Sequence, residues 1–133
     1  MQAWYKDAKP PSRLDSLTVE MLKLPGKPPK LRSKAGECRY LLPFAAQVAS
    51  EYNDGTVHRS TVDLLMQNLL EISACISVEP YDHHRASAAC DRMCSLYAAL
   101  ETVALAQNDS ASWRIKPKLH MIDFVHRPRI RLT

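Results

Sequence analysis

Two consecutive segments of the chain repeat apolar side chains at the three- and four-residue spacing of an amphipathic helix. In the first, Ser60 is the expected N-cap, the apolar residues cover more than one face, and Pro80 stops the helix near Glu79. The second covers residues 83–107 and follows Asp82, its expected N-cap. No alternating strand pattern with hairpin turns competes with these helices, so the sequence predicts an all-α fold with the two segments packed side by side.

A third amphipathic helix is expected within residues 35–53. Pro43 interrupts its apolar pattern, so this helix either starts near Leu42, with Pro43 in its first turn, or is kinked at the proline. A last short helix is expected to begin at Pro117 and to stop before Pro128. Together these segments predict a bundle of three to four helices.

The first 34 residues hold five of the nine prolines and eight of the 18 lysines and arginines. Proline fixes φ and has no N–H to donate, so this part is expected to be an irregular, basic, Pro-rich arm. Within it, only residues 15–24 are expected to form a short helix, with Asp15 or Ser16 as the cap. Residues 24–30 are expected to be an extended linker with polyproline character.

Charge divides the chain into three parts. Residues 1–34 carry a net charge of +5, residues 35–112 carry −6, and residues 113–133 carry +5. Basic ends attract the phosphates of nucleic acid, and equally they keep a small domain soluble. We expect a basic arm with one short helix at 1–34, a helical domain at 35–126 and a basic tail at 127–133.

The four cysteines are Cys38, Cys75, Cys90 and Cys94, and three of them lie in apolar helical segments without the loop-rich spacing of a disulfide scaffold. Residues 1–9 lack the apolar centre of a secretion signal, and no run of about 18 uncharged apolar residues is present to span a membrane. We therefore expect reduced thiols that pack as small apolar groups. We also expect an intracellular location, with the nucleus as a candidate compartment, and no membrane partner.

The residue pattern does not point to catalysis. The three glycines, Gly26, Gly36 and Gly55, are too far apart to form a phosphate-binding loop. Cys90 and Cys94 lie a turn or more inside their helix, away from the N-terminal amides that would stabilise a thiolate, and their neighbours on that face are apolar. We therefore expect no enzymatic activity, no cofactor, no metal and no small-molecule substrate.

The C-terminal part combines an aromatic side chain with cations. Trp113 is suited to stack on a base while Lys116 and Lys118 contact phosphates. Equally, Trp113 is suited to anchor the end of the chain to the helical core, with the cations in solvent. The candidate nucleic-acid-binding residues are Trp113, Arg114, Lys116, Lys118, His120, Arg127, Arg129 and Arg131.

Two short motifs resemble a known family. Residues 31–37, Leu-Arg-Ser-Lys-Ala-Gly-Glu, followed by 39–44, Arg-Tyr-Leu-Leu-Pro-Phe, are similar to the opening of a helical region in transposases of eukaryotic cut-and-paste transposons and in host proteins derived from them. Residues 113–121, Trp-Arg-Ile-Lys-Pro-Lys-Leu-His-Met, resemble a later motif of the same region. The resemblance singles out His120 with its neighbouring lysines. It implies a region that accompanies an RNase H-like catalytic core, and it carries no catalytic residue over to this chain.

From these observations we expect a non-catalytic, transposase-derived helical module whose basic ends contact nucleic acid. The alternative is a protein-interaction subunit, which binds a protein partner or a second copy of itself through apolar helix faces and the Pro-rich arm. Salt distinguishes the two, because phosphate contacts weaken steeply with added salt and apolar contacts do not.

Overall fold

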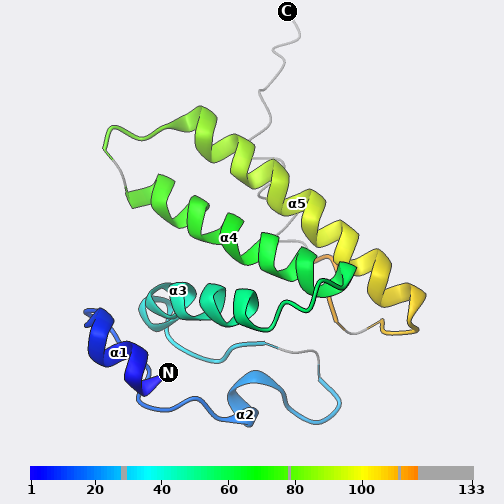
Figure 1. Ribbon diagram of the computed structural model, residues 1–133, viewed down its shortest axis with the longest axis horizontal. Helices are drawn as coiled ribbons and strands as arrows, with labels where there is room; N and C mark the ends of the chain where they lie inside the picture. The colour runs from blue at the N-terminus through cyan, green and yellow to red at the C-terminus, as the bar shows by residue number, and fades with distance from the viewer. Residues whose placement is uncertain (28–29, 78, 111, 117–133) are drawn as a thin grey trace, which may run out of the picture.

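The computed structural model describes residues 1–27, 30–77, 79–110 and 112–116, and all regular elements in these ranges are helices (Figure 1). The prediction of an all-α fold is therefore confirmed for this part of the chain. The expected last helix from Pro117 and the basic tail at 127–133 lie outside the described residues. The helices are α1 (Gln2–Ala8), α2 (Val19–Leu22), α3 (Ala35–Glu51), α4 (Val57–Ser77) and α5 (His83–Ala106).

The two longest helices, α4 and α5, pack against each other along their lengths, as their apolar periodicity predicts (Figure 1). Leu65 of α4 and Met93 and Leu100 of α5 are the buried centre of this interface. The start of α5 is also as predicted, because the Asp82 carboxylate accepts a hydrogen bond from the backbone N–H of Arg85 at 3.0 Å. The helix ends at Ala106, one residue before the expected boundary.

The predicted start of α4 is wrong by one turn. The helix begins at Val57, and the hydroxyl of Thr56 accepts the N–H of Arg59 at 3.4 Å in the place of a cap. Ser60 is inside the helix, where its hydroxyl donates to the side-chain oxygen of Asn53. The turn before the helix thus caps it earlier than the hydrophobic pattern alone indicates.

Helix α3 packs on α4 on the side away from α5, so α4 lies between its two neighbours (Figure 1). It begins at Ala35 and runs through Pro43, so the alternative of a start near Leu42 is wrong. Pro43 faces solvent, which limits the cost of the internal hydrogen bond that a proline removes. At the junction with α4, the Asp63 carboxylate accepts hydrogen bonds from Ser50 at 2.7 Å and from Asn53 at 3.1 Å.

The described part of the first 34 residues contains two short helices, not one. Helix α1 was not predicted, and it exists because Tyr5, only 1% exposed, is buried with Leu14 and Leu41 in a second core cluster. The Tyr5 hydroxyl accepts the backbone N–H of Leu14 at 3.0 Å, which folds the chain back over the helix. Trp4 packs on Phe44 of α3 with ring centroids 5.8 Å apart.

The second helix, α2, is shorter than the predicted 15–24 segment and is capped by Thr18 instead of Asp15 or Ser16. The extended linker expected after it is also wrong for the described residues. Pro25 and Gly26, the latter with φ of +69°, form a tight turn, and the N–H of Lys27 donates to the Leu24 carbonyl. The N–H of Lys30 then returns to the Leu22 carbonyl at 2.8 Å. The Pro-Gly pair therefore reverses the chain.

None of the helices in the described part of the chain combines the length and the apolar character that a membrane crossing requires.

Candidate functional site

Trp113, the aromatic residue of the predicted nucleic-acid site, is held against the helical core. Its indole N–H donates to Nε2 of His58, near the start of α4, at 3.1 Å. Its ring also meets Tyr97 of α5 edge-on, with centroids 5.7 Å apart, and packs on the buried cluster around Leu65 and Leu100. Of the two roles open for Trp113, this arrangement has the geometry of an anchor.

Residues 112–116, which we call the strap, are tied to α5 by further hydrogen bonds. The Tyr97 hydroxyl donates to the carbonyl of Arg114 at 3.3 Å, and the N–H of Ile115 donates to the Glu101 carboxylate at 3.1 Å. The side chains of Arg114 and Lys116 are exposed, as a phosphate contact requires. The other candidates, Lys118, His120, Arg127, Arg129 and Arg131, lie outside the described residues.

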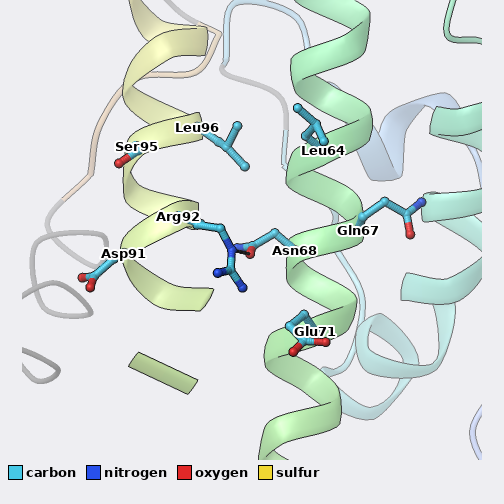
Figure 2. A pocket seen from close by; sticks show the side chains of 8 residues that line it. All are labelled: Leu64, Gln67, Asn68, Glu71, Asp91, Arg92, Ser95 and Leu96. Carbon is cyan, nitrogen blue, oxygen red and sulfur yellow. Dashed lines mark hydrogen bonds between the residues drawn. The ribbon is translucent and has the colours of Figure 1, made fainter. Parts of the chain in front are cut away.

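A groove with a volume of about 570 Å³ runs along the α4–α5 pair on one side (Figure 2). The side chains of Asn68 and Arg92 point toward each other across it, and Leu64 and Leu96 flank it further along the two helices (Figure 2). Its lining residues, all from these two helices, are Leu64, Gln67, Asn68, Glu71, Asp91, Arg92, Ser95 and Leu96.

The central polar groups of the groove are bonded within the protein. Asn68 is 7% exposed, its amide donates to the carbonyl of Ala89 at 2.7 Å, and its side-chain oxygen accepts Nε of Arg92 at 3.2 Å. Glu71 binds Arg85 through both carboxylate oxygens, and this hydrogen bonding holds the pKa of Glu71 below its usual value. The network joins α4 to α5 and occupies Asn68, Glu71 and the Nε donor of Arg92.

The apolar part of the groove contains an exposed side chain, that of Leu64. Leu64 is 59% exposed although it lies in the middle of the long helix α4, and Leu96 is half-buried beside it. The sequence carries a signal for this surface, since the α4 pattern is apolar on more than one face. It does not show which face is left open, because that depends on how α3 and α5 are placed around α4.

The cysteines are free thiols, and Cys75 and Cys90 are buried between α4 and α5. Burial, together with the nearby Cys94, Asp91 and Cys75, raises the pKa of the Cys90 thiol. A raised thiol pKa is the opposite of what a nucleophilic or metal-binding cysteine needs. Among the described residues, no group of three or more histidine, cysteine or carboxylate side chains is placed to hold a metal ion.

Comparison of the chain with models of protein families, with curated proteins and with solved structures gives no match. The resemblance to transposases therefore rests on the two short motifs of the sequence alone.

Proposed function

We propose that the chain is a non-catalytic protein-interaction module that binds an amphipathic helix of a partner protein in the α4–α5 groove. The observation that carries this proposal is the combination of a satisfied polar network with an exposed leucine. Asn68, Glu71 and Nε of Arg92 are engaged by neighbouring groups, and a partner that covers Leu64 and Leu96 gains the free energy of burying their apolar surface. A partner helix with an apolar face covers such a surface well.

Charge favours a basic partner helix. Residues 35–112, which contain α3, α4 and α5, hold four lysines and arginines against ten acidic residues, a net charge of −6. At the groove itself the charges are more nearly balanced, because Glu71 is paired with Arg85 and the exposed Asp91 is followed by the exposed Arg92. A helix with an apolar face flanked by lysines or arginines therefore complements the leucines of the groove and the net negative charge of residues 35–112.

The test uses a defined peptide probe, a helix of about five turns made of leucine and lysine at helical spacing, and a second peptide of the same composition in shuffled order. We expect the amphipathic peptide to bind the wild-type protein in isothermal titration calorimetry and the shuffled peptide to bind much more weakly. Leu64→Gln removes the exposed apolar contact and should reduce binding about tenfold or more, which corresponds to the burial of one leucine.

Leu105→Gln is the matched control, because Leu105 is 55% exposed on α5 and lies outside the groove. This variant should bind the amphipathic peptide as the wild type does. The proposal fails if neither peptide order binds, if order makes no difference, or if the Leu64 and Leu105 variants behave alike.

Nucleic-acid binding is the second candidate function, and the exposure of Arg114 and Lys116 on the strap favours it. The resemblance to transposases points the same way, and a nuclear location would accompany this function. With the indole of Trp113 held by His58, contact would be made by cations to phosphates, without base stacking.

Labelled duplex or single-stranded DNA should then be retarded at low salt, with retention falling steeply as salt rises. Lys116→Ala with Lys118→Ala should weaken this binding without a change in melting temperature, and the absence of any retardation would exclude the function.

A further inference from the structure

The hydrogen bond between Trp113 and His58 depends on the protonation state of the histidine. An indole N–H is a donor only, so Nε2 of His58 must be the acceptor, at 3.1 Å. A neutral imidazole offers such an acceptor when its proton is on the other nitrogen. An imidazolium has two donors and no acceptor, so proton uptake by His58 turns this contact into two N–H groups that face each other.

The backbone of Trp113 has a conformation that favourable contacts must offset. Its φ of +55° lies in the left-handed region, which a bulky residue seldom adopts. The contacts that offset this conformation are the bond to His58, the edge-on packing on Tyr97, the packing on the buried Leu65–Leu100 cluster and the hydrogen bonds of the strap to α5. Loss of the first contact therefore weakens a segment that is already under conformational strain.

From this geometry we propose that His58 and Trp113 form a pH-sensitive latch, which holds the strap on the α4–α5 pair while His58 is neutral and releases it when His58 is protonated. The released strap exposes the Trp113 indole and frees the backbone that carries Arg114 and Lys116. None of the latch side chains lines the groove, so the latch does not depend on the proposed function.

The titratable and charged groups around the latch come from four parts of the chain. Helix α5 contributes Tyr97 and Glu101, α4 contributes Arg59, and the strap contributes Arg114. The turn after α5 contributes Asp109, whose carboxylate accepts the N–H of Ser112 at 3.0 Å. Arg59 is engaged with Asp54 and the Tyr52 carbonyl, and Glu101 accepts the Ile115 N–H. Burial and the nearby Glu101 raise the pKa of the Tyr97 phenol, so Tyr97 stays neutral throughout the acid-to-neutral range. Histidine is thus the side-chain type here that ordinarily changes charge between about pH 5 and 8.

The test follows the fluorescence of Trp113 in a Trp4→Phe background, which leaves Trp113 as the one tryptophan of the chain. Emission wavelength and quenching by neutral acrylamide are recorded between about pH 8 and pH 5, the range in which histidine titrates. We expect a red shift and a severalfold rise in the quenching constant on acidification, with one midpoint. Far-ultraviolet circular dichroism should stay constant, which separates release of the strap from unfolding.

Three variants in the same background decide the interpretation. His58→Gln retains a side-chain acceptor at every pH and should remove the transition, with Trp113 protected throughout. His58→Phe has no acceptor and should leave Trp113 exposed at both ends of the range. His84→Gln, at the exposed start of α5, should keep the wild-type transition. The latch is overturned if the wild type shows no transition, or if the transition persists in His58→Gln.

Discussion

Replacement of Leu100 by alanine tests the packing between the two longest helices, α4 and α5. Leu100 has no exposed surface, and it lies with Leu65 and Met93 at the centre of the α4–α5 interface. The strap residue Trp113 and the α4 residue Leu69 pack on the same cluster. A cavity at this position therefore affects α4, α5 and the strap together.

The expected loss follows from the complete burial of the side chain. Leucine to alanine removes three carbons, and at about 0.8 kcal/mol for each buried carbon the transfer contribution is about 2.5 kcal/mol. A cavity that does not collapse raises the total toward about 5 kcal/mol. For a domain of this size, the melting temperature should fall by about 10–20 °C.

Urea unfolding followed by circular dichroism measures this change, with two leucines as internal comparisons. Leu105→Ala, at an exposed position near the end of α5, should change the free energy of unfolding by about 0.5 kcal/mol or less. Leu69→Ala, at a half-buried position, should lower the free energy of unfolding by an intermediate amount, in the lower part of the usual range of about 2–5 kcal/mol. A loss below about 1 kcal/mol for Leu100→Ala would refute the assignment of the α4–α5 interface as the core.

Two further substitutions test the N-terminal part and the α3–α4 junction. Tyr5→Phe leaves the buried N–H of Leu14 without its acceptor and should cost about 1–3 kcal/mol in urea unfolding, whereas no loss would mean that the first residues do not dock on α3. Hydrogen bonds from Ser50 and Asn53 lower the pKa of Asp63 in the folded state, so the stability they contribute is present above the ordinary pKa and is lost as pH falls through the folded value. The melting temperature should therefore fall less steeply from about pH 6 to pH 3 for Asp63→Asn than for the wild type. Parallel plots of melting temperature against pH would contradict this account.

The long helices were predictable because their signals are local. Helix α5 has a capping aspartate at Asp82, a helical stripe of small and apolar residues and a turn after Ala106, all of which lie in the sequence itself. The elements that the sequence did not predict depend on contacts between distant residues. Helix α1 has no capping side chain and spans only seven residues, and its stability depends on Tyr5 meeting Leu14 and Leu41. Tyr5 and Leu41 lie more than 30 residues apart in the chain, and a contact of that kind leaves no periodic pattern in the sequence.

The candidate site was partly predictable. The sequence alone offered two roles for Trp113, and the choice between them depends on His58, which is 55 residues away and attracts no notice in the sequence. The groove was not predictable, because it needs the register of α4 against α5. The pairs Asn68–Arg92 and Glu71–Arg85 set that register, and each joins residues that no spacing rule connects.

Asn68 connects the fold to the proposed function. An apolar interface between two helices resists separation but only weakly resists sliding, whereas a buried amide with specific partners favours one register. The bonds of Asn68 to the Ala89 carbonyl and to Arg92 thus determine where Leu96 lies relative to Leu64. A preformed groove binds a partner without the cost of first ordering its own walls. Asn68→Leu should therefore leave stability little changed while it weakens peptide binding, and this combination separates the role of the amide in register from any role in stability.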